Sequence, residues 1–414
     1  MDPRASVEAV WRIESARIVS TLARLTGDFA AAEDLAQEAL AEALETWPRD
    51  GVPASPGAWL VTVARRRAID AWRRQERLDE RHALLARDLE TVTEDEWEPI
   101  HDDVLRLVFT ACHPVLSRES QVALTLRVVA GMTSEEVARA FLVPVATIQA
   151  RITRAKKTLA AAGVPFATPE PDEWRPRLSA VLAVVNSVFT EGYAATSGDR
   201  WLKPEVAREA LRLGRSLAAL LPREPEVHGL VALMELQAAR FPARVAADGT
   251  PVLLPDQDRS RWDRSAIRRG RDALAVVDRL GRGRGPYALQ ASIAEVHALA
   301  PRYEDTDWER IVLLYDALAT LAPSPVVELN RAVAVSIATG PGTALMTVDR
   351  LLASGALRDS HLAHSVRADL LDRLDRPGEA ATAFRTAAGL AANERERATL
   401  LERAVAAEAR AAPL

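Results

Sequence analysis

Apolar residues recur every three or four positions along most of the chain, which is the spacing of helices that bury one face. In the first fifty residues this spacing predicts one helix from Ser6 to Leu25 and a second over 30–46. Gly27 and Asp28 are expected to separate the two helices. The outer face of the second helix collects acidic and amide side chains: Asp34, Gln37, Glu38 and Glu42. This face is therefore expected to be acidic.

A stretch with three prolines and two glycines, WPRDGVPASPG, predicts a loop over 47–57. The helix expected after it, over 58–74, carries a basic cluster that begins at Arg65. Trp59 and Trp72 lie 13 residues apart, which is not the spacing of one helical face, so Trp59 is expected in the core.

Residues 132–157 have the pattern of a helix-turn-helix. Thr133 and Glu136 have the spacing of a capping box, in which each side chain binds the backbone amide of the other residue. Pro144 suits the first helical position of the second helix. The buried stripe of that helix is expected at Ile148, Ile152, Ala155 and Leu159. The remaining face has small, amide and arginine side chains, which a helix in the DNA major groove requires.

The C-terminal part of the sequence contains a repeat. One pattern of small and apolar positions begins at residues 299, 332 and 368, with spacings of 33 and 36 residues. The repeated positions are Leu299, Arg302, Ile311, Tyr315 and Leu318, then Ala332, Val335, Ala344, Val348 and Leu351, and then Ala368, Leu371, Ala380, Phe384 and Ala387. A period of ~34 residues is typical of tetratricopeptide-like repeats, in which each helix pair buries its apolar face against the next. A stacked helical solenoid is therefore expected.

Composition narrows the class of protein further. Hydrophobic residues make up 48% and charged residues 27% of the 414 residues, as in globular proteins. No apolar stretch approaches the ~20 residues of a membrane span, and the first residues lack a basic and then apolar leader, so a cytoplasmic protein with no membrane contact is expected. Cys112 is the only cysteine, which excludes an intramolecular disulfide.

The net charge of −5 argues against general coating of nucleic acid, but the charges are segregated. Residues 1–50 have five cations and ten acids, whereas 65–74 has five arginines and one acid. Residues 76–103 have three cations and eleven acids, and 151–157 has four cations and no acid. Two basic segments thus flank an acidic one, which favours local contacts with phosphate.

Three of these segments resemble parts of the bacterial extracytoplasmic-function sigma factors. They are DLAQE at 34–38, WLVTVARRRAIDAWRR at 59–74 and the helix-turn-helix at 133–157, in this order. Residues 170–414 resemble the C-terminal extension of the subgroup whose sigma module is fused to tetratricopeptide-like repeats. The stretches that resemble this subgroup are FTACHP (109–114), which precedes the extension, and FTEGY (189–193) and DQDRSRWDR (256–264) within it. The resemblance implies an all-α protein with two small sigma domains and a helical-repeat domain.

The implied organisation has five parts. It comprises a region 2 domain at 1–76, an acidic linker at 77–102, a region 4 helix-turn-helix domain at 103–163, a second linker at 164–176 and a repeat domain at 177–414. The implied function is promoter-specific transcription initiation, modulated by the repeat domain.

The same resemblance implies core RNA polymerase, through its beta-prime and beta subunits, and promoter DNA as partners, and it implies no cofactor. The residues expected to bind core polymerase are Asp34, Gln37 and Glu38. The residues expected to bind the melted promoter are Arg65, Arg66, Arg67, Trp72, Arg73 and Arg74. The residues expected in the major groove are Thr147, Gln149, Ala150, Arg151, Arg154 and Lys156. Two departures are Arg66, where the family commonly has asparagine, and Phe141-Leu142, where many members have a Leu-Gly turn.

Other chemistry-bearing residues have competing interpretations. The possible regulatory or partner-binding residues are Glu191, Tyr193, Asp258, Arg259, Arg261, Trp262 and Asp263, although alternating aspartate and arginine also suits an ion network within a turn. Cys112 and His113, with His101 nearby, follow an apolar run at an expected helix end, where a buried cysteine and a capping histidine explain them better than a metal does. No catalytic constellation is present, so the protein is not expected to be an enzyme.

Two other functions fit parts of this sequence. A one-component transcriptional regulator would use the repeats as a sensor and the helix-turn-helix on an operator, without dependence on polymerase. A repeat scaffold would retain a helix-turn-helix that no longer binds DNA. The repeat domain itself is expected to bind a protein partner or to contact the sigma domains.

Overall fold

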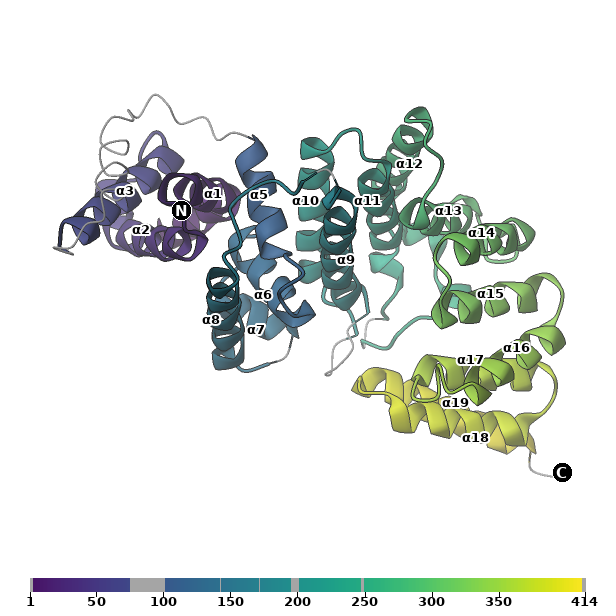
Figure 1. Cartoon of the computed structure of the whole chain (residues 1–414). Coiled ribbons are helices and arrows are strands. Elements are labelled where there is room, and N and C mark those ends of the chain that lie inside the picture. The colour runs from purple at the N-terminus through teal and green to yellow at the C-terminus, as the bar shows by residue number, and fades with distance from the viewer. Residues whose placement is uncertain are drawn as a thin grey trace. The chain divides into compact units, whose positions relative to one another are not determined.

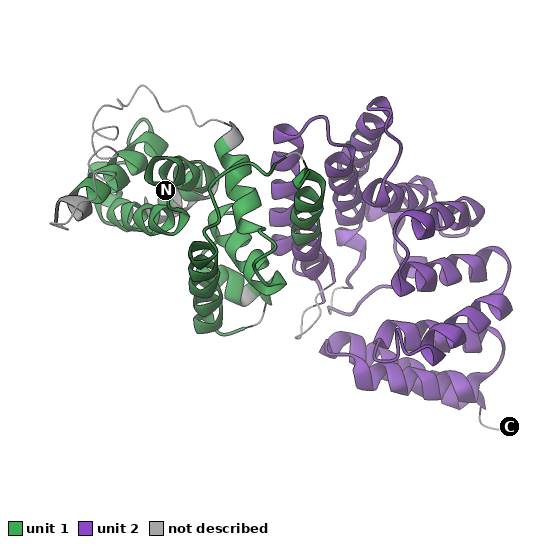
Figure 2. Cartoon of the chain, in the orientation of Figure 1, with its two compact units in different colours: residues 1–185 green, residues 186–414 purple. Residues whose placement is uncertain are grey.

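The computed structural model describes residues 3–74, 101–141, 143–170, 172–194, 201–246 and 249–411. Within these ranges every regular element is a helix, apart from an isolated bridge between Val245 and Pro251, so the all-α prediction is confirmed. The chain forms two compact units, Met1–Val185 and Asn186–Leu414 (Figure 2). None of the described helices is long and apolar enough to cross a membrane.

The first unit opens with the helices α1 (Pro3–Thr26), α2 (Phe29–Asp50) and α3 (Pro56–Arg74) (Figure 1). Gly27 ends α1 in the left-handed conformation (φ 67°), which costs glycine little. Asp28 then accepts hydrogen bonds from the amides of Ala30 and Ala31 and so caps α2. The predicted break between the two helices is therefore confirmed.

Helix α2 is longer than its sequence predicts, because it continues through Pro48 to Asp50. Trp47, expected in a loop, is buried and packs edge to face on Trp59 at 5.4 Å between ring centroids, which holds the additional turn. The buried side of α2 consists mainly of small residues: Ala32, Ala36, Ala39 and Ala43. Leu35 and Leu40, the larger apolar residues of α2 near this side, are half-buried.

Four helices of the first unit follow: α5 (His101–Ala111), α6 (Arg118–Val128), α7 (Ser134–Phe141) and α8 (Val145–Ala161). The capping box of α7 is confirmed. The Thr133 amide donates to Glu136 Oε2 at 2.8 Å, and the Glu136 amide donates to Thr133 Oγ1 at 3.1 Å. Pro144 lies one position earlier than expected, as the residue that precedes α8, and its carbonyl accepts the Thr147 amide.

Helix α9 (Trp174–Tyr193) begins in the first unit and ends in the second. Its Trp174 ring lies 5.1 Å from the Phe109 ring of α5, and Arg118 of α6 donates to the carbonyl of Ala183. The first half of α9 therefore packs with α5 and α6. The repeat domain predicted to start at 177 thus begins with a half-helix that belongs to the first unit.

After the end of α9, the described residues of the second unit form ten further α-helices (Figure 1). They are α10 (Pro204–Leu220), α11 (Pro225–Ala238), α12 (Arg264–Arg279), α13 (Pro286–Leu299), α14 (Trp308–Leu321), α15 (Pro325–Ala338), α16 (Pro341–Ala353), α17 (His361–Arg373), α18 (Pro377–Leu390) and α19 (Glu394–Ala411). Six of these described helices begin with proline, whose missing amide proton costs nothing at that position. From α13 onward each helix packs on the next one in the chain, as in a stack of helical hairpins.

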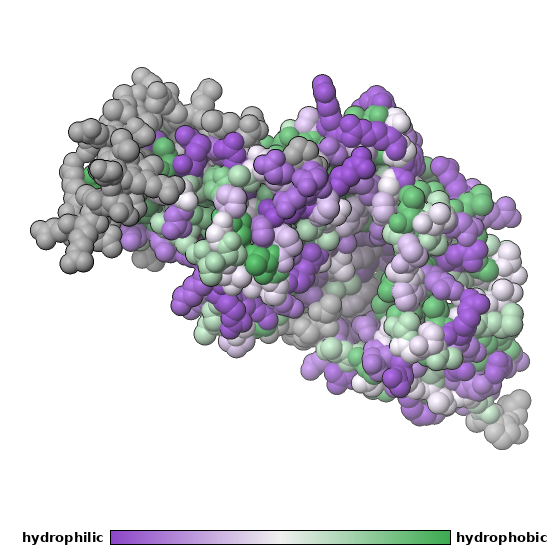
Figure 3. All heavy atoms as spheres, in the orientation of Figure 1, coloured by the Kyte–Doolittle hydropathy of each residue, from purple (hydrophilic) through white to green (hydrophobic). Residues whose placement is uncertain are grey.

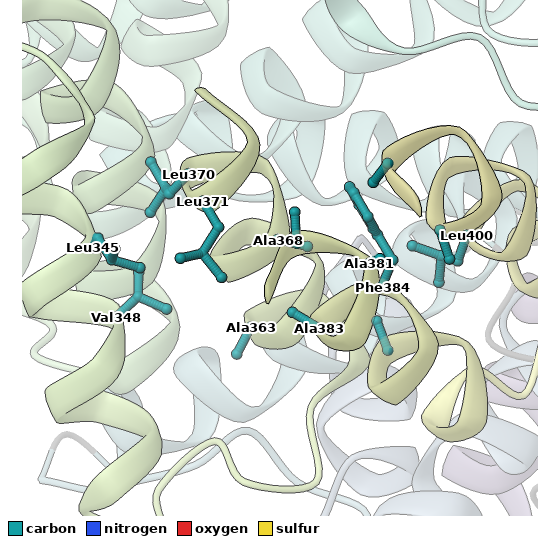
Figure 4. Packing of buried hydrophobic residues seen from close by; sticks show 14 of the residues in the cluster. Leu345, Val348, Ala363, Ala368, Leu370, Leu371, Ala381, Ala383, Phe384 and Leu400 are labelled. Carbon is teal, nitrogen blue, oxygen red and sulfur yellow. The ribbon is translucent and has the colours of Figure 1, made fainter. Parts of the chain in front are cut away.

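The burial pattern supports two of the three predicted repeats. Positions of the second and third repeats, such as Val348 and Phe384, share one core built from α15 to α19 (Figure 4). For the first repeat, the two positions predicted in its first helix are wrong. Leu299 is 50% exposed at the end of α13, and Arg302 lies beyond that helix and pairs with Asp305. Ile311 of the same repeat is buried in α14 as expected.

One ion pair in the second unit predicts a pH dependence. His361 Nε2 at the start of α17 lies 3.2 Å from Glu396 Oε1 of α19, and this hydrogen bond raises the pKa of His361 despite partial burial. The pair should therefore stabilise the unit fully below the unfolded pKa of ~6.5, and this stabilisation should be lost as pH rises through the higher folded pKa. In urea unfolding, the free energy of unfolding should fall by under about 1 kcal/mol between pH 6 and pH 8 because of this pair. The His361→Gln variant should lack this part of the pH dependence. Equal pH dependence in both proteins would contradict the assignment.

Candidate nucleic-acid interface

Helix α8 has the two faces that its sequence predicts. Each residue of the expected stripe is at most 7% exposed: Ile148, Ile152, Ala155 and Leu159. Gln149, Ala150 and Arg154 are exposed away from this stripe, and Thr147 and Arg151 are half-buried at its edges. An exposed face of this kind lets the helix backbone approach base edges while amide and guanidinium groups donate to them.

Lys156 was expected on this exposed face, but its side chain points toward α2 instead. Its side chain is 14% exposed, and its ammonium lies 2.6 Å from both Glu33 Oε2 and Asp34 Oδ1 of α2. Burial disfavours the charged form, but the two carboxylates outweigh this effect and raise the pKa of Lys156. In this conformation Lys156 is a contact between α2 and α8, not a DNA-facing residue.

The arginines of α3 lie beside the acidic face of α2. Arg66 Nη2 lies 2.7 Å from Glu42 Oε1, and Arg67 contacts both Glu42 at 2.7 Å and Glu38 at 3.2 Å. The hydrogen bond that Arg67 donates to Glu42 is the main reason that the pKa of Arg67 is raised. Arg66 keeps 63% of its side chain exposed, and Arg65 is half-buried. Trp72, Arg73 and Arg74 belong to the last turn of α3, and their side chains lie outside the described residues, as does most of the acidic linker at 77–102.

All three residues expected to bind polymerase lie on α2 and have partners within the chain. Asp34 pairs with Lys156, Gln37 accepts a hydrogen bond from Arg127 of α6, and Glu38 pairs with Arg67. A fourth residue of this surface, Glu33, was not predicted. Its side chain is 5% exposed and lies 2.6 Å from Lys156 and 3.6 Å from Arg127. No local pattern marks Glu33, because both of its partners come from other helices.

Cys112 and His113 have structural roles. Burial raises the pKa of Cys112 to about 11, and its thiol hydrogen-bonds Thr125 Oγ1 at 3.3 Å. His113 Nδ1 accepts the amide of Val115 at 3.1 Å in the turn after α5. The interpretation of Cys112 as a buried cysteine is therefore supported, whereas His113 holds this turn and does not cap the helix through its ring. No group of metal-ligating side chains occurs among the described residues.

Glu191 and Tyr193, at the end of α9, belong to a buried cluster in the second unit. Glu191 Oε1 lies 2.7 Å from the ammonium of Lys203, and both side chains are less than 10% exposed. The guanidinium of Arg244 covers the Tyr193 ring at 3.6 Å, and burial lowers the pKa of Arg244 to about 10. These contacts lie within the fold and account for both residues structurally.

The segment DQDRSRWDR is also largely structural, although its carboxylates bind backbone amides rather than neighbouring arginines. Asp258 accepts the Ser260 amide, and Asp263 caps α12. Arg259, 6% exposed, donates to the carbonyls of His297 and Ala300 at 2.7 and 2.8 Å and so satisfies the end of α13. Trp262 is buried under the guanidinium groups of Arg240 and Arg259, whereas Arg261 is exposed.

Comparison with known families matches three segments of the chain. Sigma-70 region 2 matches residues 12–78, and Sigma-70, region 4 matches residues 106–159. Residues 177–277 match a family of unknown function, DUF6596. An uncharacterized protein of Rhizobium meliloti (strain 1021) is 46% identical over 383 residues, which cover 89% of this chain and 88% of that protein. No solved structure matches.

The two sigma-70 matches coincide with the two helical groups of the first unit. Region 2 falls on α1 to α3, with the acidic and arginine-rich surfaces, and region 4 falls on α5 to α8, with the helix-turn-helix. The third match begins in α9 and ends in α12. The chain therefore belongs to the extracytoplasmic-function sigma factors of RNA polymerase, which direct promoter-specific transcription initiation, and carries a C-terminal extension.

Proposed function

We propose that this sigma factor divides its work among three helices of the first unit. Helix α2 docks on the beta-prime subunit of core polymerase through Asp34, Gln37 and Glu38. Arginines of α3 hold the melted promoter strand, and the exposed face of α8, with Gln149 and Arg154, reads duplex DNA. The protein then acts in the cytoplasm as a stoichiometric subunit rather than as a catalyst.

The observation that carries this proposal is the separation of charge on adjacent helices. Asp34 and Glu38 keep 67% and 55% of their side chains exposed, so α2 offers carboxylates to a basic protein surface. Arg66 on α3 and Arg154 on α8 offer exposed guanidinium groups, which suit phosphates and guanine edges. A protein that only bound DNA would gain nothing from an exposed acidic helix beside its basic one.

The C-terminal unit is proposed to modulate initiation by binding a protein partner. Stacked helical hairpins present long surfaces on which a peptide can lie. On the face in Figure 3, hydrophilic and hydrophobic residues are interspersed over the described helices of this unit. Such a mixed surface suits a protein partner better than a lipid bilayer.

The full-length chain should give promoter-specific transcripts when it is mixed with purified core polymerase and fragmented genomic DNA, and core alone should not. Sequencing of the RNA 5′ ends locates the start sites directly, so no promoter has to be chosen for the assay. A one-component regulator would need a resident sigma factor in the same reaction, so the absence of specific starts would reject the proposal.

A chain that ends at residue 194 tests the C-terminal unit in the same assay. This truncation keeps α9 whole and therefore keeps the contacts of Trp174 and Ala183 with the region 4 helices. The modulatory role predicts a changed yield of the same start sites. An unchanged yield, with unchanged affinity for core, would reject that role.

A further inference from the structure

Helix α12 lies in a strongly basic segment of the second unit (Figure 1). Residues 259–284 contain nine arginines and three aspartates, with no lysine, in a chain whose net charge is −5. The buried side of α12, which includes Ile267, Leu274 and Val277, packs in one core with α11 and α13. The opposite side of the helix therefore faces solvent and is open to a partner.

Four arginines of α12 share this open side. They are Arg264, Arg268, Arg271 and Arg279, and all four are exposed. At about 100° per residue they fall within an arc of about 80° around the helix axis. Their Cα atoms span about 22 Å along that axis, at a rise of ~1.5 Å per residue. We call these four residues the α12 arginine stripe.

One member of the α12 arginine stripe is paired with a carboxylate. Arg271 Nε lies 3.2 Å from Glu295 Oε1. The other three, Arg264, Arg268 and Arg279, form no ion pair with any residue that the structure describes. Three guanidinium groups on one face of the helix are therefore available to an external anion.

The stability of α12 does not account for this arrangement. Arg264 and Arg268 are four residues apart, and Arg268 and Arg271 are three apart, so like charges repel along one helix face. Arg264 also lies in the first turn, where a cation opposes the helix dipole. Arg279, in the last turn, is the one member that the dipole favours. A bound polyanion would remove the repulsion among the other three.

The chemistry of the stripe suits the phosphates of duplex DNA. A guanidinium group can donate two parallel N–H bonds to one phosphate. A duplex about 22 Å long carries about 13 phosphates, so each free arginine can reach one. The structure describes every residue of α12, and none of its large apolar side chains is exposed. A protein interface normally has an apolar core, whereas binding to phosphates requires none.

We propose that the α12 arginine stripe is a further DNA-binding surface of this sigma factor, which holds the phosphate backbone of duplex DNA without regard to sequence. The proposal goes beyond the roles proposed for α3 and α8, because the contact needs neither a melted strand nor a base edge. The stripe adds affinity for DNA and leaves the choice of promoter to the other helices. It does not replace the protein partner proposed for the stacked hairpins.

The salt dependence of DNA binding tests the stripe, because each phosphate contact releases a counterion. The free full-length chain is titrated with a random-sequence duplex of about 40 bp, at salt concentrations from about 50 to 200 mM. The triple variant Arg264→Gln, Arg268→Gln, Arg279→Gln should reduce the slope of log affinity against log salt by about three. At about 50 mM salt its affinity should be at least about tenfold weaker than that of the wild type.

The matched control removes three exposed arginines elsewhere in the same unit. It combines Arg223→Gln, Arg358→Gln and Arg395→Gln, which lie on three separate parts of the chain. Both triple variants change the net charge equally, so the control separates the stripe from the charge of the whole chain. The control should keep the affinity and the slope of the wild type. Equal affinities of the stripe variant and the wild type would overturn the proposal, as would an equal loss in both variants or no measurable binding by the wild type.

A tethered cleavage reagent tests where the DNA lies. Ala275 is exposed between Arg271 and Arg279 on the same side of α12. The thiol of an Ala275→Cys variant can be coupled to an iron–EDTA reagent, whereas Cys112 stays unlabelled because it is buried and its pKa is raised to about 11. This conjugate should cleave the bound duplex, and the same reagent on Ala398→Cys, exposed on α19, should not. Intact DNA with the Ala275→Cys conjugate would overturn the proposal.

Competition decides which nucleic acid the stripe prefers. Single-stranded RNA with the same number of phosphates should displace the labelled duplex less effectively than unlabelled duplex does. If the RNA displaces the duplex at the lower concentration, the stripe is an RNA-binding surface and the proposal of duplex binding is wrong.

Discussion

Replacing both Arg151 and Arg154 by glutamate is expected to abolish promoter-specific transcription while the chain still binds core polymerase. Arg154 is exposed on the reading face of α8, and Arg151 lies half-buried at its edge. Loss of one guanidinium contact to a base or phosphate costs ~1–3 kcal/mol, and two carboxylates add repulsion from the DNA backbone. A loss of at least about a hundredfold in specific transcripts should follow.

Sequencing of RNA 5′ ends with core polymerase and fragmented genomic DNA would measure this loss, and pull-down of core would show that docking persists. Arg208→Glu is the matched control, because it reverses an exposed arginine on α10 of the other unit. Because Arg151 is partly buried, the single Arg154→Glu variant keeps the test independent of misfolding and should lose at least about tenfold. Specific start sites that survive at full yield in both variants would show that α8 does not read the promoter.

Features set by residues a few positions apart could be predicted from the sequence. The stripe of α8 follows from the 3.6-residue period alone, and the capping box of Thr133 and Glu136 needs only a spacing of three. The break at Gly27 and Asp28 likewise depends on local backbone preference. These predictions are confirmed because distant residues do not change them.

Features that depend on distant residues could not be predicted. Within residues 151–157 Lys156 has no acidic neighbour, so it was expected to face DNA, yet its partner Glu33 lies 123 positions earlier in the chain. Arg259 similarly donates a hydrogen bond to the carbonyl of Ala300, 41 positions away. A residue that the sequence offered as a possible ligand-binding group therefore satisfies the end of α13. Local charge counts reveal a basic segment but do not show which surface neutralises it.

The repeats fall between these two cases. Their period is a local property, and it identified buried positions in α15 to α18. The period gave a wrong prediction at Leu299, because α13 ends at that residue and the chain turns. The Leu299 side chain has the spacing of a buried position but stays half exposed. The period predicts stacking only while successive helices keep the same geometry.

Phe384→Ala should destabilise the end of the C-terminal unit more than any surface change in it. Phe384 is 1% exposed in the core that α15 to α19 share (Figure 4). The guanidinium of Arg403 covers its ring at 4.4 Å. Truncation of a buried phenylalanine costs ~3–5 kcal/mol, because the cavity remains after the transfer free energy is lost. This cost is a large fraction of the ~5–15 kcal/mol that typically stabilises a domain.

The position of Phe384 near the C-terminus determines how this loss should appear. In stacked hairpins each unit depends on its neighbour, so α17 to α19 should open before α10 to α14. Hydrogen exchange should therefore rise in α17 to α19 of the variant and stay unchanged in α1 to α8. Val405→Ala, at a 62% exposed position of α19, is the matched control and should cost under about 0.5 kcal/mol in urea unfolding. If the two variants unfold at the same urea concentration, Phe384 does not join α18 to α19, and the stacking of the last three helices is wrong.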